Sequence, residues 1–131
     1  MESVMAEMKQ NPRILCVDDN PDLRRTLEQQ FENEDFVVDT AVDGQSALEK
    51  IGLTVYDVVL LDVKMPKMNG MAVLQEMKKL GKLTNVIMLT GIDDTQVALE
   101  CVKLGARDFI QKPYDPEELL HIVNRVLSAQ Q

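Results

Sequence analysis

Tryptophan is absent from this chain, and aromatic residues make up only 4% of it. Proteins that bind single-stranded nucleic acids or sugars stack them on aromatic side chains, so the composition argues against both classes. Basic residues are also scarce, with 14 Lys and Arg against 22 Asp and Glu and a formal net charge of -8. Because this balance repels DNA phosphates and anionic membranes, we expect no direct nucleic-acid partner and no membrane partner.

Long apolar runs and paired cysteine motifs are missing too. No window approaches the ~18 apolar residues of a membrane span, and residues 1–11 contain no apolar core of signal-peptide length. The two cysteines, Cys16 and Cys101, lie in separate apolar runs without a CxxC spacing, which is typical of reduced thiols in a protein core. These absences predict a cytoplasmic protein.

The length of 131 residues suits a single domain, and apolar and charged fractions of 45% and 27% are ordinary for a globular protein. The first apolar run begins at Arg13, and the last helical pattern ends at about Ala129. We therefore expect a polar leader over residues 1–12 and one domain over residues 13–131.

Short apolar runs alternate with segments of helical period along this domain. Several runs are apolar at consecutive positions, as in strands covered on both faces of a parallel sheet. The predicted strands are residues 13–17, 36–38, 57–61, 85–89 and 108–110. Apolar residues spaced three to four apart predict helices with one buried stripe at residues 23–31, 73–80, 97–102 and 119–127. A further helix is expected at about residues 45–51.

The predicted helix ends carry recognisable signals. Asn20 and Asp115 each precede a proline, the pattern of an N-cap followed by proline at the first helical position. Gly52, Gly81 and Gly105 follow helical runs, where a left-handed residue commonly ends a helix. Five alternating strand–helix units predict a three-layer α/β fold, a doubly wound five-stranded parallel sheet between two layers of helices.

Polar residues directly follow four of the five predicted strands. Asp18 and Asp19 come after the first strand, and Asp62 comes after the third. Thr90 and Lys112 follow the fourth and fifth strands. Since the carboxyl ends of parallel strands share one edge of the sheet, where ligands bind, we expect these side chains to converge.

A cluster of three carboxylates has a different interpretation from a single aspartate at the end of a strand. A single aspartate at such a position is commonly a helix cap or a solvated loop group, and Asp18 and Asp19 adjoin the helix start at Asn20, so capping stays an alternative for either. Three carboxylates together repel one another unless a cation intervenes. Oxygen ligands suit a hard divalent ion such as Mg²⁺, and no His or Cys lies at this edge to favour zinc or copper.

A carboxylate nucleophile, a divalent cation, a lysine and a hydroxyl are together the components of phosphoryl transfer to aspartate. Asp62 is the expected nucleophile because it ends the most apolar strand and is therefore held most rigidly. Lys112 and the cation neutralise charge on the phosphoryl oxygens, and Thr90 offers a hydroxyl donor. No glycine-rich nucleotide-binding loop and no Ser–His–Asp triad accompany these residues.

One set of residues, spread over nearly the whole chain, resembles the receiver domain of two-component response regulators: Asp18-Asp19, Asp62, Met65-Pro66, Gly70, Thr90, Phe109 and Lys112-Pro113. The resemblance implies a flavodoxin-like fold with strand order 2-1-3-4-5. It also implies a phosphorylation-controlled signalling switch, either stand-alone or part of a longer regulator, that does not act on outside substrates. The phosphoryl group would come from a sensor histidine kinase or a phosphotransfer protein.

The resemblance assigns roles at the acidic site. It implies Asp62 as the phospho-acceptor and Lys112 as a contact of the phosphoryl group. It implies Mg²⁺, for which Mn²⁺ can substitute, held by Asp18, Asp19 and Asp62. The backbone carbonyl of Lys64 would complete the protein ligands.

The resemblance also implies a moving part. Thr90 would turn toward the phosphoryl oxygen after transfer, Phe109 would turn inward with it, and the peptide bond before Pro113 would be cis. For Phe109 a core position is the open alternative, since an aromatic residue on a short buried strand is commonly part of the core. The face formed by the fourth helix, the fifth strand and the fifth helix would then change shape and bind an effector, an output domain or a second copy of the chain.

Two positions depart from the family pattern. Lys64 places a cation two residues after the acceptor, where relatives more often carry a neutral or acidic side chain, and we expect it to weaken Mg²⁺ binding. Ile92, two residues after Thr90, is apolar where a polar group could position a hydrolytic water. We therefore expect a long-lived acyl phosphate.

Two other functions share some of these residues. Phosphatases of the haloacid-dehalogenase type also use an aspartate nucleophile, but they need a second aspartate two residues later, where this chain has Lys64. A degenerate receiver that binds partners without phosphate is the other alternative, and the intact Asp62, Thr90 and Lys112 argue against it.

Overall fold

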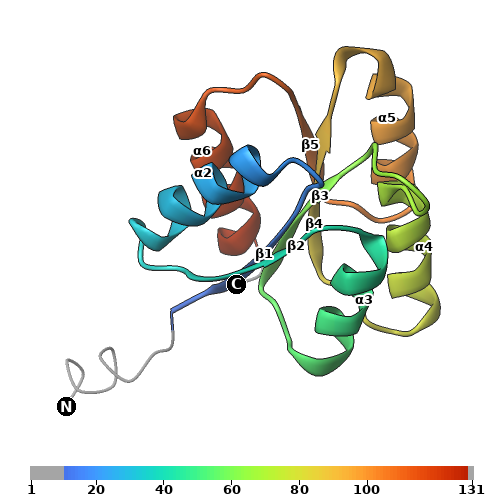
Figure 1. Cartoon of the computed structure of the whole chain (residues 1–131), viewed down its shortest axis with the longest axis horizontal. Coiled ribbons are helices and arrows are strands. Elements are labelled where there is room, and N and C mark those ends of the chain that lie inside the picture. Colours follow the sequence, from blue (N-terminus) through green and yellow to red (C-terminus); the bar gives the residue numbers. More distant parts are fainter. Residues whose placement is uncertain (1–10, 130–131) are drawn as a thin grey trace.

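Five parallel strands form one sheet in the order β2-β1-β3-β4-β5 (Figure 1). The computed structural model describes residues 11–129. Its strands are β1 (Arg13–Val17), β2 (Val37–Ala41), β3 (Val58–Asp62), β4 (Asn85–Thr90) and β5 (Asp108–Gln111). The predicted strand order and flavodoxin-like architecture are confirmed.

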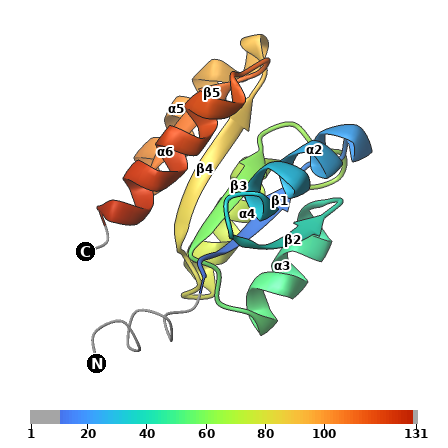
Figure 2. The ribbon, with the colours of Figure 1, turned by 90° about the vertical axis from the view of Figure 1, so that its left-hand side faces the viewer.

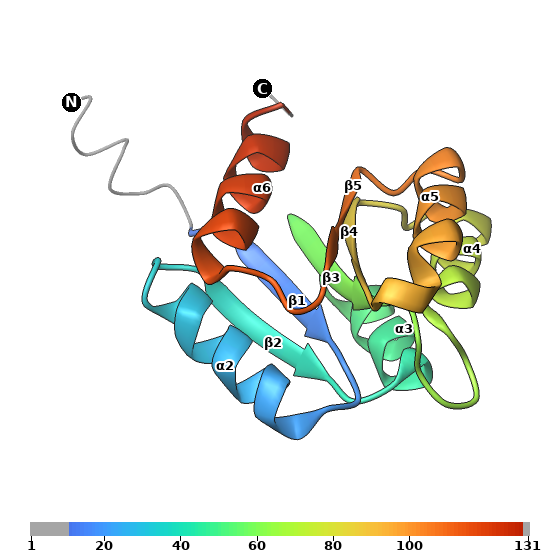
Figure 3. The same ribbon diagram turned by 90° about the horizontal axis from the view of Figure 1, so that it is seen from above.

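Helices cover both faces of the sheet (Figures 1 and 3). Helices α2 (Pro21–Glu32) and α6 (Pro116–Ser128) lie on one face, and α3 (Gly44–Leu53), α4 (Gly70–Lys79) and α5 (Thr95–Lys103) lie on the other, with a short 3₁₀ turn, η1 (Ile92–Asp94), before α5. Figure 2 shows α6 running alongside β4. Among residues 11–129, no helix combines the length and the apolar character needed to cross a membrane.

Each central strand contributes to two separate cores. Leu15 and Val17 of β1 pack with α3, α4 and α5, whereas Ile14 and Cys16 pack with α2 and α6. All five residues of β3 are buried. Because successive side chains of a strand point to opposite faces, a strand buried on both faces is apolar along its length, and β3 departs from this only at its last residue, an aspartate. This explains the continuous apolar runs of the sequence and the burial of Cys16 on β1, whereas Cys101 is buried on the inner face of α5.

The helix ends follow the predicted chemistry at most positions. The Asn20 side chain accepts hydrogen bonds from the backbone N–H groups of Asp22 and Leu23, and Asp115 accepts one from Glu117. Gly81 and Gly105 have φ angles of 68° and 125°, the left-handed backbone that glycine adopts most easily.

Predicted boundaries are wrong at the end of α3 and the end of β2. Gly52 does not end its helix, because α3 continues through the exposed Leu53 and stops at Thr54, whose extended backbone donates its N–H to the carbonyl of Lys50. Strand β2 runs beyond residue 38 to Ala41. It is an edge strand that is only partly buried, so it accommodates polar residues such as Asp39, which accepts a hydrogen bond from the Tyr56 hydroxyl at 2.6 Å. Residues 1–10 of the expected leader lie outside the described part of the chain.

Gly70 is required where α4 begins beside the end of β3. A Cβ at this position would overlap the carbonyl oxygen of Asp62 and lie 3.0 Å from Met88 Cε and from Val63 Cα. Gly70→Ala should therefore lower the free energy of unfolding by about 1–3 kcal/mol, as overpacking against backbone does. Urea denaturation measures this change.

Gly52→Ala is the matched control, because a Cβ there meets nothing within 4 Å and Gly52 lies inside α3. It should raise the free energy of unfolding by up to about 1 kcal/mol through helix propensity. Equal effects of the two substitutions would contradict the close approach of α4 to β3.

Candidate functional site

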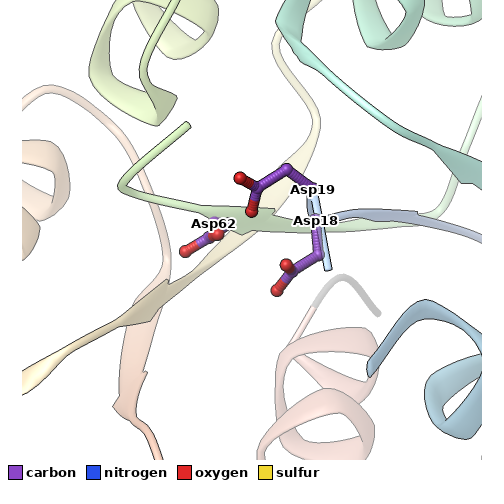
Figure 4. Close-up of side chains that lie close together, drawn as sticks. All are labelled: Asp18, Asp19 and Asp62. Carbon is purple, nitrogen blue, oxygen red and sulfur yellow. The ribbon is translucent and has the colours of Figure 1, made fainter. Parts of the chain in front are cut away.

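The three predicted carboxylates come together at the carboxyl edge of the sheet (Figure 4). Asp18 and Asp19 follow β1 directly, and Asp62 is the last residue of β3, the neighbouring strand. One oxygen of each carboxylate lies within 4.8 Å of the others. Asp18 and Asp62 are buried, with exposed fractions of 0% and 5%, whereas Asp19 is exposed.

Asp18 is held by hydrogen bonds from three elements. Its Oδ1 accepts from the backbone N–H of Asn20 at 2.9 Å, and its Oδ2 accepts from Lys112 Nζ at 2.8 Å. Its backbone carbonyl accepts from Arg24 Nη1 at 2.7 Å. The N-cap of α2 is Asn20, so neither Asp18 nor Asp19 serves as the helix cap.

Lys112 connects β5 to the acidic cluster. Besides its bond to Asp18, its Nζ lies 3.3 Å from Asp62 Oδ1. Burial alone would lower the pKa of Lys112, but the hydrogen bonds and charges of Asp18 and Asp62 raise it above its usual value, so the ammonium stays charged. The Lys112–Pro113 peptide bond is cis.

The environment of Asp62 destabilises its negative charge. Burial and then the charge of Asp18 raise the pKa of Asp62 to about 6, while Lys112 and a hydrogen bond from the backbone of Lys64 act in the opposite direction. A second positive charge at the cluster would relieve the remaining repulsion. The donor set is all carboxylate oxygen, which fits a hard divalent cation, and the three aspartates can hold a metal ion.

The other predicted site residues lie on β4 and β5 or in the segments that follow β3 and β4. Thr90, the last residue of β4, is buried and its hydroxyl donates to the Gly91 carbonyl at 3.0 Å. Phe109 on β5 is partly buried against the core beneath α3, α4 and α5. The side chains of Lys64 and Ile92 are exposed, Ile92 by 70%.

Sequence reasoning missed Arg24 as a component of the site. Arg24 lies near the start of α2 and reaches back six residues to the Asp18 carbonyl. The only signal in the sequence was its place near the start of the helix that follows the acidic pair, and the same holds for Arg25, which is exposed.

Comparison with known proteins identifies the family. The family model for the response regulator receiver domain matches residues 14–124. Regulatory protein AtoC of Escherichia coli (strain K12) is 39% identical over 118 residues, which cover 90% of this chain and 26% of AtoC. Response regulator ArlR of Staphylococcus saprophyticus is 36% identical over 118 residues, which cover 90% of this chain and 53% of ArlR. The chain spans about half or less of the length of these curated relatives.

Solved structures agree in fold. The match to the receiver domain of Francisella response regulator 1452 has a TM-score of 0.85 and 31% sequence identity. It covers 92% of this chain and 100% of the Francisella chain. The match to the receiver domain of NtrX from Brucella abortus has a TM-score of 0.83 and 32% sequence identity. It covers 88% of this chain and 98% of the NtrX chain. The chain therefore belongs to the response regulator receiver domain family. It is a phosphorylation-controlled switch, and it is not an enzyme acting on outside substrates.

Asp62 should make the stability of the metal-free protein depend on pH. Its pKa is about 6 in the folded protein against an ordinary value of 3.8, so between these two values the folded state binds more protons than the unfolded state. The stabilising contribution of Asp62 is therefore present below the ordinary value and is lost as the pH rises through about 6. Asp62→Asn should remove this slope and raise the free energy of unfolding at neutral pH by about 1–3 kcal/mol, measured by urea denaturation in EDTA.

Asp93→Asn provides the control, because Asp93 is exposed on η1 and its carboxylate is solvated. This substitution should leave the pH slope unchanged. An Asp62→Asn protein that keeps the wild-type slope, or that is less stable at neutral pH, would show that Asp62 is not the source of the repulsion.

Proposed function

We propose that Asp62 accepts a phosphoryl group from the phosphohistidine of a sensor histidine kinase or a phosphotransfer protein. The observation that carries the proposal is the convergence of Asp18, Asp19 and Asp62 with the ammonium of Lys112 at one edge of the sheet. Mg²⁺, or Mn²⁺ in its place, would be held by the three carboxylates and the backbone carbonyl of Lys64. When bound, the ion supplies charge neutralisation on the phosphoryl oxygens.

The chain's own residues perform the transfer in this proposal. An oxygen of Asp62 attacks phosphorus, a P–O bond to Asp62 forms, and the bond from phosphorus to the donor breaks with its electron pair leaving on the donor. Lys112, already 3.3 Å from Asp62, holds a phosphoryl oxygen as a point charge. Asp62 enters the reaction ionised, since its pKa of about 6 lies below neutral pH.

The switch in this proposal runs through β4 and β5. The Thr90 hydroxyl, which donates to the Gly91 carbonyl without phosphate, turns to donate to a phosphoryl oxygen. Phe109, partly exposed on the adjacent strand, turns inward with it. The face formed by α5, β5 and α6 thereby changes shape and binds an effector, an output domain or a second copy of the chain.

Intact mass spectrometry tests the acceptor. After incubation with acetyl phosphate and Mg²⁺, the wild-type protein should gain about 80 Da, one phosphoryl group. Asp62→Ala should gain nothing, because the carboxylate nucleophile is gone, and EDTA should abolish the gain in the wild type. Asp93→Asn, on the exposed η1 turn, is the matched control that should still be phosphorylated.

Two results would overturn the proposal. Phosphorylation of Asp62→Ala would place the acceptor elsewhere. No mass gain in a folded wild-type protein would instead indicate a receiver that binds its partners independently of phosphate.

The acyl phosphate on the phosphorylated protein should be long-lived. Ile92 is 70% exposed beside the end of β4 and offers no polar group to orient a water molecule for hydrolysis. The mass difference should therefore persist for minutes or longer after removal of acetyl phosphate, and Ile92→Asn should shorten the half-life several-fold. A wild-type half-life of seconds without added phosphatase contradicts this prediction.

A further inference from the structure

We propose that Arg24 is a positioning residue for the metal site, which orients Asp19 through the peptide group between Asp18 and Asp19. The inference rests on the function proposed above for the acidic cluster. Arg24 is half-buried near the start of α2, and its Nη1 donates to the backbone carbonyl oxygen of Asp18 at 2.7 Å. No other described group donates a hydrogen bond to that oxygen.

The two adjacent aspartates differ in how they are held. Asp18 is buried, its backbone N–H donates to the Ala41 carbonyl at 3.2 Å, and its two carboxylate oxygens accept from Asn20 and Lys112. Asp19 is exposed, and within residues 11–129 its carboxylate accepts no hydrogen bond. Figure 4 shows the two side chains leaving the end of β1 in different directions. The backbone therefore has to set the direction of Asp19.

Arg24 acts on the part of the backbone that sets this direction. The carbonyl of Asp18 and the nitrogen of Asp19 belong to one rigid peptide plane, so a hydrogen bond that holds the oxygen also holds the plane. Only one backbone rotation then separates that plane from the Asp19 side chain. The hydrogen-bond ladder of α2 begins at Asn20, whose carbonyl accepts from the Arg24 N–H at 3.0 Å, so the Asp18 carbonyl receives nothing from the helix backbone.

An arginine suits this task better than a lysine. Its planar guanidinium donates in fixed directions, and its hydrogen bond to a carbonyl occupies no carboxylate oxygen of the cluster. A charge-assisted hydrogen bond is also stronger than a neutral one.

A positioning role for Arg24 and simple electrostatics predict opposite changes in Mg²⁺ affinity when the guanidinium is removed. The guanidinium is a cation close to the metal site, so Coulomb repulsion alone predicts that its removal strengthens Mg²⁺ binding. If Arg24 orients Asp19, its removal weakens Mg²⁺ binding in spite of the lost repulsion. The sign of the change therefore separates a positioning residue from a mere surface charge.

Isothermal titration calorimetry of the full chain with Mg²⁺ at neutral pH provides the test. Arg24→Gln should raise the dissociation constant about tenfold, the effect of losing one hydrogen bond from a charged group. Arg24→Lys, which keeps the charge without the planar geometry, should give an intermediate value. Arg25→Gln is the matched control, because Arg25 is exposed and its only side-chain ion pair among residues 11–129 is a surface pair with Asp22 at 3.5 Å. It should leave the dissociation constant unchanged or slightly lower.

Each remaining outcome has a definite meaning. A folded Arg24→Gln protein with an unchanged or lower dissociation constant overturns the inference, even if its free energy of unfolding falls, since Arg24 would then be purely structural. If Arg24→Gln does not fold, a wild-type dissociation constant in Arg24→Lys overturns it instead. A wild-type protein that binds no Mg²⁺ overturns the proposed function and this inference together.

Discussion

The repulsion between the buried carboxylates of Asp18 and Asp62 is the constraint on which the rest of this site depends. Their exposed fractions are 0% and 5%, and burial together with the charge of Asp18 raises the pKa of Asp62 to about 6. Lys112 offsets this repulsion, because its ammonium lies 2.8 Å from Asp18 and 3.3 Å from Asp62. The ends of β1, β3 and β5 are thereby joined by charge at one edge, in addition to the backbone hydrogen bonds and apolar packing that hold the sheet together.

The order of the strands explains why a lysine is needed for this contact. Strands β1 and β3 are neighbours, so Asp18 and Asp62 meet directly, but β4 separates β3 from β5. A group on β5 must therefore reach across the end of β4 to touch the carboxylates. The Lys112 backbone is fixed to β4 by an N–H donated to the Thr90 carbonyl at 2.7 Å, and its long aliphatic stem carries the charge over the remaining distance.

The site residues whose position depends on sheet topology could be predicted from the sequence. A contact that depends on how far a side chain extends, such as that of Arg24, could not. The convergence of Asp62, Thr90 and Lys112 followed from one rule, that parallel strands end at the same edge of the sheet. The end of α3 was predicted wrongly at Gly52, because the helix continues past its last buried residue and no buried stripe marks an exposed turn. Arg24 escaped prediction because periodicity says which face of a helix is buried and says nothing about a side chain that reaches back to a backbone carbonyl.

The same arrangement explains how a local change of charge could reach a distant face under the proposed function. Asp18 and a phosphoryl group on Asp62 would compete for one ammonium, and the backbone of Lys112 cannot shift without β4, because its N–H donates to the Thr90 carbonyl. Thr90 pairs in register with Gln111, two residues beyond Phe109 on β5. Under the proposed function, a change at the carboxylates would therefore be passed to both strands that carry the proposed switch residues, through hydrogen bonds that are already in place before phosphorylation.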